Sequence, residues 1–421
     1  MINESARMTH WGDIARERLE IISMASEAGP GVTRLPFSEQ YEAAIGFITS
    51  WMTAAGCAVH LDAAGTLVGR RAGPKGAGTL LIGSHQDSVR QGGCFDGIMG
   101  VALGCLALEK LAQDRVELPF AVEILAFADE EGVRFPTALM GPRALAGTLD
   151  PAVFAMTDNT GQTLSEALAQ IGGNSKVALK LTRDNKDIFG FLEVHIEQGP
   201  VLESLDAPLG VVTAISGIER HSVQIFGEAG HAGTVPMTLR KDALRAGAKL
   251  VEAVHDLALR HDLRATVGAL TVSPNVVNAI PAQVDLTVEI RAPNDETREA
   301  AGVELAEICA QIASETGTQI EQSRSYAQPA VACDPKLRAL LSNSVAQVSG
   351  QAPDLPSGAT HDASAMADLC PVAMLFVRCR GGISHSPAEY ASNADMGAAV
   401  DALALTLATY NRAPEAEPVH V

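Results

Sequence analysis

Four apolar, strand-like runs in this chain are each followed by a group of acids and histidines. His85 and Asp87 follow the run TLLIG, and the triplet Asp129–Glu131 follows VEILAF. His195 follows FLEV, and His385 and Glu389 follow VAMLFV. Helix-like segments separate most of the runs, notably GVALGCLALEKLAQ at residues 100–113, a rhythm typical of parallel strands joined by helices. Because parallel strands end at one edge of their sheet, we expect these polar groups to lie close together.

The length of the chain, 421 residues, predicts two domains rather than one core. Near residue 212 the βα rhythm gives way to long strands and two helices, and after about residue 329 it resumes. We therefore predict an α/β domain made of residues 1–212 and 329–421, with a mixed, largely parallel sheet flanked by helices. Residues 213–328 would form a smaller, inserted α+β domain of ferredoxin-like type.

The composition excludes several classes of protein. With 47% hydrophobic and 19% charged residues the chain is typical of a globular enzyme, and no apolar run is long enough to span a bilayer. A net charge of −19 without a basic stretch argues against nucleic acid as a partner but leaves a small anionic substrate open. The seven cysteines form no CxxC pair and the first residues lack an apolar signal region, so we expect a cytoplasmic protein.

The residue types at the strand ends suit metal binding. Alternation along a strand places His85 and Asp87 on the same side, where the carboxylate could accept the second ring N–H of the histidine. Asp96, just before a predicted helix, could bridge two cations, and the triplet Asp129–Glu131 is costly to assemble unless cations compensate it. Each group alone also fits a solvated loop, a surface acid patch or a structural histidine. The four groups together favour a dinuclear metal site.

At these residues the chain resembles a known family. The resemblance extends from about residue 8 to 412, and it rests on motifs that are specific to the family. These are GSHxDS, GGxFDG, EEGxRF, HIEQGPVLE, GHAGTxPM, RxDAL, NxVNxIP, SGAxHDA and GGISHxPxE. The family comprises the metal-dependent amidohydrolases related to the zinc aminopeptidases, in the branch of N-carbamoyl-L-amino acid hydrolases, β-ureidopropionases and allantoate amidohydrolases. The resemblance implies a dinuclear-metal aminopeptidase-like fold whose inserted domain serves as a lid and dimerisation domain.

The resemblance also implies roles for individual residues. Two divalent ions (zinc, manganese, cobalt or nickel) would be bound by His85 and His195 on one side, Glu131 and His385 on the other, with Asp96 as the bridge. Glu130 would be the general base, and His231 would stabilise the oxyanion in a neighbouring subunit's site, which implies a homodimer. The substrate, a small molecule bearing a carboxylate, would be bound by Gln198, Asn278, Arg291, Gly358 and His361.

The expected activity is hydrolysis of the ureido (N-carbamoyl) C–N bond of a small L-configured carboxylic acid, giving an amino acid, ammonia and carbon dioxide. Allantoate amidohydrolase, or another amide or acyl-amino-acid hydrolase of this fold, is the nearest alternative. An aminopeptidase is disfavoured by His195, since peptidase branches usually carry an acid there. A catalytically inactive binding protein is disfavoured by the complete set of expected ligands and base. Departures from the family pattern, such as Arg378 and Arg380 ahead of the last ligand, leave the substrate's identity open.

Overall fold

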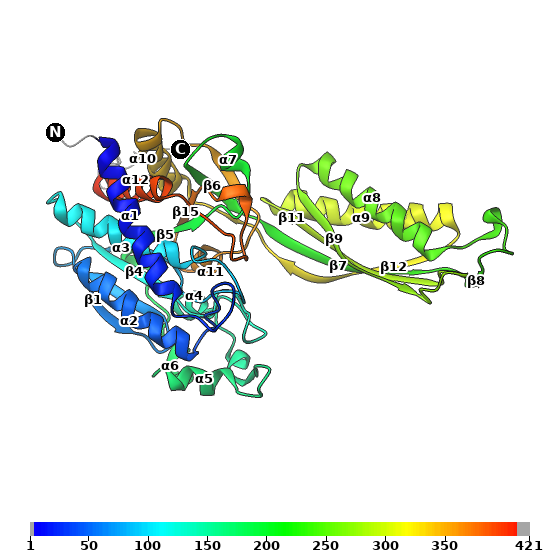
Figure 1. Cartoon of the computed structure of the whole chain (residues 1–421), viewed down its shortest axis with the longest axis horizontal. Helices are drawn as coiled ribbons and strands as arrows, with labels where there is room; N and C mark the ends of the chain where they lie inside the picture. The colour runs from blue at the N-terminus through cyan, green and yellow to red at the C-terminus, as the bar shows by residue number, and fades with distance from the viewer. Residues whose placement is uncertain (1–3, 411–421) are drawn as a thin grey trace, which may run out of the picture. The chain divides into compact units, whose positions relative to one another are not determined.

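The computed structural model describes residues 4–410. Two predictions from the sequence fall partly or wholly outside this range: a loose C-terminal tail at 413–421, and a helix at 394–411, whose last residue is not described. The chain forms two compact units (Figure 1). The first contains residues up to 213, 333–355 and those from 361 onwards; the second contains 214–332 and 356–360. The division differs from the predicted one at residue 213, which lies in the first unit, and at residues 329–332 and 356–360, which lie in the second.

The larger sheet is mixed, and its parallel part lies in the centre. Its strands follow the order β1-β2-β4-β3-β5-β15-β6-β13, with β14 paired to β6. The pairs β4–β3, β3–β5 and β5–β15 are parallel, whereas β1–β2, β2–β4, β15–β6 and β6–β13 are antiparallel. The strands are β1 Ala58–Leu61, β2 Leu67–Arg71, β3 Thr79–His85, β4 Ala121–Phe127, β5 Ile188–Ile196, β6 Leu209–Ile215, β13 Val331–Ala332, β14 Asp354–Ser357 and β15 Val372–Val377.

Helices cover this sheet because its central strands are buried on both faces and mostly apolar. All seven residues of β3 and of β4 are buried, as expected for parallel strands enclosed by helices. Every second residue of the central strands packs with α1, α2, α3, α10 and α12 in one core. The helices of this unit are α1 Glu4–Ser23, α2 Glu39–Ala54, α3 Ile98–Gln113, α4 Met140–Ala146, α5 Leu164–Gln170, α6 Ser175–Ala178, α7 Val201–Ser204, α10 Pro335–Ser349, α11 Asp362–Met366 and α12 Asn393–Thr409.

The start of α3 explains one glycine of the GGCFDG segment. Gly97 precedes the helix with φ 65°, in the left-handed region that glycine adopts at little cost. A Cβ atom at this position would lie 2.3 Å from the ring of His85. The helix can therefore begin directly beside His85, and it places Asp96 next to the end of β3.

The second unit has the ferredoxin-like order of elements. Its chain runs β7 Gly217–Phe226, α8 Ala243–His261, β9 Arg264–Ser273, β11 Gln283–Ala292, α9 Asp295–Thr316 and β12 Gln319–Gln328. The four strands form an antiparallel sheet in the order β12-β7-β11-β9. Both helices pack on one face, where β7 and β11 bury alternate residues (Figure 1). A two-stranded ribbon, β8 Gly230–His231 with β10 Ala279–Ile280, completes the unit.

The described residues contain neither a membrane-spanning helix nor a disulfide. No helix within residues 4–410 is long and apolar enough to cross a membrane. All seven cysteines fall in this range, and none is joined to another by a disulfide.

Candidate metal centre

The expected ligands gather at the carboxyl ends of the parallel strands. His85 is the last residue of β3 and pairs in register with Phe127, the last residue of β4, after which Glu130 and Glu131 follow. His195 is the last but one residue of β5 and pairs with Phe376 near the end of β15. The loop after β15 carries His385. The clustering predicted from the strand ends thus follows from the parallel register of four strands.

The carboxylate of Asp96 lies at the centre of the cluster. Its Oδ1 atom is 3.0 Å from Nε2 of His195 and 3.4 Å from Nε2 of His85. Its Oδ2 atom is 3.3 Å from Nε2 of His385. Burial alone raises the pKa of Asp96, but the charges and hydrogen bonds of the three histidines outweigh burial and hold the pKa well below its usual range. One anionic carboxylate therefore joins ligands from three different strand ends.

Main-chain carbonyls orient the two buried histidines. Nδ1 of His85 lies 3.0 Å from the carbonyl oxygen of Asp87, and Nδ1 of His195 lies 2.9 Å from that of Ile196. These carbonyls can only accept, so Nδ1 of each ring carries a proton, and Nε2, which faces Asp96, is the nitrogen that would bind a cation. The carboxylate of Asp87 was expected to orient His85, but its Oδ1 is 4.0 Å from the ring nitrogen. That expectation was wrong, because the backbone turns after β3 and brings the carbonyl of Asp87 closer.

The side chain of Asp87 instead supports the acidic loop after β4. It is completely buried, and it accepts the backbone N–H of Glu130 over 3.2 Å and that of Glu131 over 3.3 Å. Asp87 therefore positions the two glutamates rather than the histidine.

The donor atoms fit two divalent cations. His85, Asp96 and His195 form one group in which the ligand atoms lie within 4.8 Å of one another, and Asp96, Glu131 and His385 form a second. Oε1 of Glu131 is buried without a hydrogen-bond partner, as expected for an oxygen that awaits a cation. Imidazole and carboxylate donors are those that first-row divalent metals prefer.

Glu130 lies beside the two groups and is more deeply buried than Glu131. It is 8% exposed, and its carboxylate forms a metal-capable group with the imidazole of His85 and the carboxylate of Glu131. Burial raises the pKa of Glu130 well above its ordinary value, although the charge of His85 opposes the shift. Burial, with the charge of Asp96, raises that of Glu131 to about 7. A buried carboxylate with a raised pKa is suited to accept and return a proton near neutral pH.

Two of the expected substrate-binding residues also lie in this cluster. Nε2 of Gln198 donates to Oδ2 of Asp96 over 2.9 Å, while its Oε1 is buried without a hydrogen-bond partner. His361 is buried with its ring centroid 4.5 Å from that of His195, and burial lowers the pKa of His361 well below its ordinary value. A neutral imidazole therefore adjoins the centre.

Some buried acids near the centre were not assigned a role from the sequence. Glu193 accepts the hydroxyl of Ser84 over 2.9 Å and the backbone N–H of Ala363 over 2.8 Å. Asp362 is completely buried, and neither of its carboxylate oxygens has a hydrogen-bond partner. Glu193 was visible beside His195 in the sequence, and Asp362 lies in the motif SGATHDA, but a sequence does not distinguish a buried acid from a solvated one.

The remaining expected residues lie in the second unit, in two separate places. His231 pairs in register with Ala279, and the carbonyl of Asn278 accepts the N–H of Ala232 over 3.0 Å, so His231 and Asn278 share the β8–β10 ribbon. Arg291 lies near the end of β11, and its guanidinium donates to the carbonyl of Gly358 over 2.7 Å. The structure thus brings Arg291 together with Gly358, and His231 together with Asn278.

Arg378, which departs from the family pattern, is occupied by two carboxylates. It forms ion pairs with Asp395 over 2.9 Å and with Asp206 over 3.0 Å. These pairs explain the extra arginine as part of the fold.

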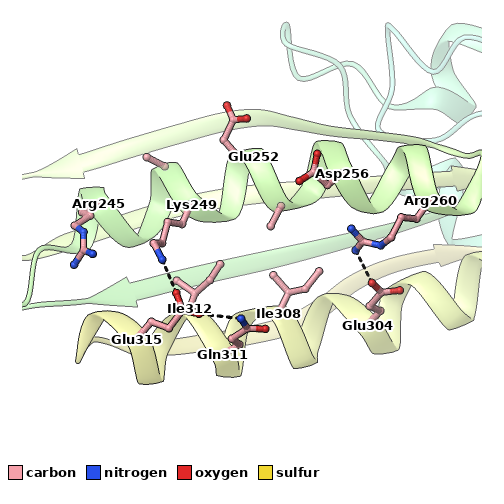
Figure 2. A pocket seen from close by; sticks show the side chains of 12 residues that line it. Arg245, Lys249, Glu252, Asp256, Arg260, Glu304, Ile308, Gln311, Ile312 and Glu315 are labelled. Carbon is pink, nitrogen blue, oxygen red and sulfur yellow. Dashed lines mark hydrogen bonds and ion pairs between the residues drawn. The ribbon is translucent and has the colours of Figure 1, made fainter.

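A groove between α8 and α9 contains none of the expected site residues (Figure 2). Its volume is about 790 Å³, and charged side chains line most of it. Across it Lys249 pairs with Glu315, and Arg260 pairs with Glu304 over 2.5 Å. Because these charges neutralise one another across the groove, it offers no concentrated charge for an ionic substrate.

Comparison with known proteins agrees with this geometry. Residues 81–409 match the model of peptidase family M20/M25/M40. An N-carbamoyl-L-amino acid amidohydrolase of Geobacillus stearothermophilus is 36% identical, over 91% of this chain and 95% of that protein. An allantoate deiminase of Arabidopsis thaliana is 37% identical, over 92% and 80%. The crystal structure of a hydantoinase/carbamoylase family amidase from Burkholderia multivorans superposes with a TM-score of 0.89 at 31% identity, covering 96% of this chain and 98% of that one. This chain therefore belongs to peptidase family M20/M25/M40.

Proposed function

We propose that the protein is a metal-dependent amidohydrolase that cleaves the ureido (N-carbamoyl) C–N bond of a small L-configured carboxylic acid. One water is consumed, and the products are an amino acid, ammonia and carbon dioxide. The observation that carries the proposal is the single buried carboxylate, Asp96, in contact with three histidines beside the buried Glu130. The similarity to an N-carbamoyl-L-amino acid amidohydrolase supports this substrate class. The equally strong similarity to an allantoate deiminase makes allantoate the alternative substrate.

The two groups of donors would bind one cation each. His85 and His195 would hold the first and Glu131 and His385 the second, with one oxygen of Asp96 directed to each. Zinc, manganese, cobalt and nickel all suit such donors. A pair of divalent cations lowers the pKa of a bound water, which supplies hydroxide at neutral pH.

Glu130 would act as the general base. It would take the proton of the attacking water and deliver it to the nitrogen that leaves. Its burial and raised pKa support this role, and its backbone is anchored by Asp87. A proton acceptor held in one orientation needs little reorganisation during the reaction.

Arg291 would bind the carboxylate of the substrate. Its guanidinium and that of Arg220 both contact Glu289, over 2.8 Å and 2.5 Å, so two positive charges share one negative charge. The three side chains therefore retain one net positive charge, and the planar guanidinium can form paired hydrogen bonds with a carboxylate. Gly358 would assist through its backbone next to Arg291, while Gln198 and His361 would supply further polar contacts. Asn278, which shares the β8–β10 ribbon with His231, would contact the substrate of the neighbouring subunit.

The inserted domain would also form a homodimer. Its edge strand β9 has ten residues without proline, and without charge after Arg264, and such an open edge is a template for pairing with another strand. On α8, which packs on β9, Leu244, Val251 and Leu259 are exposed at helical spacing along one flank. A second copy of the chain fits this surface, since pairing of the two edges would bury both flanks.

A homodimer explains how one substrate could meet both His231 and Arg291. The ribbon that carries His231 adjoins the start of β11, whereas Arg291 is the ninth residue of that strand. At about 3.3 Å per residue the two positions are roughly 25 Å apart along the sheet. One small molecule cannot touch both within one chain. We therefore propose that His231 stabilises the oxyanion in the site of the neighbouring subunit. We further propose a cytoplasmic location, which the unpaired cysteines support.

A substrate panel tests the proposal. Metal-loaded protein is incubated with N-carbamoyl-L-amino acids, the D enantiomers, allantoate, N-acyl amino acids and dipeptides, and ammonia and free amino acid are measured. The proposal expects one ammonia and one amino acid per N-carbamoyl-L-amino acid consumed, with the D enantiomers unreacted. Preferential release of ammonia from allantoate would select the alternative substrate. Cleavage of dipeptides alone would contradict both.

A further inference from the structure

Glu389 connects the loops that carry two of the metal-binding residues. Its Oε1 accepts the backbone N–H of Phe95 over 2.9 Å and that of Asp96 over 3.0 Å. Its Oε2 lies 3.1 Å from the hydroxyl of Ser384, which also lies 3.0 Å from Oδ2 of Asp96 and can donate to either carboxylate. Ser384 directly precedes His385, so a single carboxylate spans from the backbone of Asp96 to the neighbour of His385. The loops are 293 positions apart in the chain, and the side chain of Glu389 is 4% exposed.

The sequence around Asp96 accommodates this carboxylate. A Cβ atom at Gly93 would lie 2.3 Å from Oε1 of Glu389 and 2.4 Å from its Cβ, so only glycine leaves room for the side chain. The segment between β3 and α3 has no partner strand except the isolated bridge between Val32 and Gly92. Among the described residues, the side chain of Glu389 accepts the backbone N–H groups of Phe95 and Asp96 and thereby fixes the direction of the backbone at Asp96.

Glu389 is not arranged as a ligand itself. Both of its oxygens lie within hydrogen-bond distance of neutral donors, two backbone amides and a hydroxyl, rather than facing a position for a cation. It belongs to neither the His85–Asp96–His195 group nor the Asp96–Glu131–His385 group. A carboxylate that orients ligands without binding the cation is a recurrent feature of protein metal sites, where its loss lowers metal affinity about 10–100-fold.

We propose that Glu389 is a positioning residue that sets Asp96 and His385 at the separation required by the cation bound between Asp96, Glu131 and His385. The inference rests on the proposed two-cation site. His85 and His195 reach Asp96 from strands β3 and β5, which the sheet already holds in place. His385 comes from an irregular loop, and it depends on a side-chain connection to stay opposite Asp96. Loss of Glu389 therefore weakens the second cation more than the first.

The experiment compares four variants of the full chain. Glu389→Ala removes both connections, and Glu389→Asp keeps the charge but withdraws the oxygens by one methylene. Glu389→Gln keeps an oxygen that can accept both amides. Asp62→Ala is the matched control: Oδ1 of this buried residue accepts two backbone N–H groups, of Ala64 and Thr66, both over 2.9 Å, in a turn that holds no expected ligand.

Two readouts are measured, the first without metal. In the metal-free protein, amide hydrogen exchange at Phe95 and Asp96 is expected to accelerate at least about tenfold in Glu389→Ala and Glu389→Asp, and little in Glu389→Gln. Titration with a divalent ion under chelator competition is then expected to give two ions per wild-type chain. In the Ala and Asp variants one of the two dissociation constants is expected to rise about 10–100-fold while the other stays within a few-fold. Asp62→Ala is expected to bind both ions as the wild type does.

Unchanged exchange at both amides together with wild-type binding of both ions, in either the Ala or the Asp variant, would overturn the inference. If Glu389→Ala does not fold, Glu389→Asp alone decides. Equal weakening of both ions would show that Glu389 serves the whole fold and would also overturn the inference. Wild-type protein that binds fewer than two ions would contradict the proposed metal site, and the amide exchange would still test the positioning role of Glu389.

Discussion

The backbone N–H of Glu130 donates to the buried carboxylate of Asp87 over 3.2 Å. Asp87, two positions after the end of β3, thus holds Glu130, three positions after the end of β4. The neighbouring N–H of Glu131 donates to the same carboxylate over 3.3 Å. The backbones of the proposed base, Glu130, and of the proposed metal ligand, Glu131, are in this way held by one acid.

Replacement of Glu130 by Gln separates the base from the ligands. The change preserves the volume and the backbone hydrogen bond to Asp87 but removes proton acceptance. We expect metal content to persist, while kcat falls by about 10²–10⁴-fold. Metal analysis and steady-state kinetics on the same preparation check this result. If the activity disappears only because metal is lost, Glu130 is a ligand and the roles of Glu130 and Glu131 are exchanged.

Subunit mixing tests whether His231 works in the neighbouring subunit. His231→Ala and Glu130→Gln proteins are each expected to be inactive. After exchange of subunits, a mixed dimer holds one site in which both groups are intact. Activity should therefore return, up to about a quarter of the wild-type level for random pairing of equal amounts. A mixture that stays inactive, with exchange verified by mass spectrometry or fluorescence, would place His231 in its own chain's site or outside catalysis.

Substitution of Arg291 tests recognition of the substrate's carboxylate. Hydrogen bonds to charged groups contribute about 1.5–3 kcal/mol, so Arg291→Lys, which keeps the charge but loses the fork, should lower kcat/KM roughly tenfold to a hundredfold. Arg291→Ala should lower it further. The control is a substrate whose carboxylate is replaced by a neutral amide, on which wild type and Arg291→Ala should converge. Equal impairment on the acid and on the amide would make Arg291 a structural residue that serves Glu289 and Gly358.

Much of the fold could be predicted because each element is encoded locally. Apolar runs such as VAMLFV and the amphipathic segments between them specified an α/β sheet with an inserted α+β domain, and that class is confirmed. The extent of the parallel part was less accessible, since only β4, β3, β5 and β15 run parallel. Whether an edge strand pairs parallel or antiparallel depends on its neighbours rather than on its own residues. The assignment of residues 356–360 likewise depends on contacts with strands distant in sequence.

The candidate site could be predicted to the level of residue types but not of contacts. His85, Asp96, His195, Glu131 and His385 were recognisable because they follow strands or match motifs, and their roles stay predictions. The orientation of His85 was missed because its acceptor is a main-chain carbonyl, which every residue carries. The connection made by Glu389 was missed for the same reason, since its partners Phe95 and Asp96 offer backbone amides. Backbone groups carry no sequence signal, and only the fold shows where they point.

We propose that hydrolysis of the ureido bond needs both cations. The most direct test measures ammonia released from an N-carbamoyl-L-amino acid, and in parallel from allantoate, while a divalent ion is titrated into protein shown by elemental analysis to be metal-free. We expect no ammonia without metal and a rise in the rate that saturates at two ions per chain. Full ammonia release by the metal-free protein, or none from either substrate at full metal loading, would contradict this account.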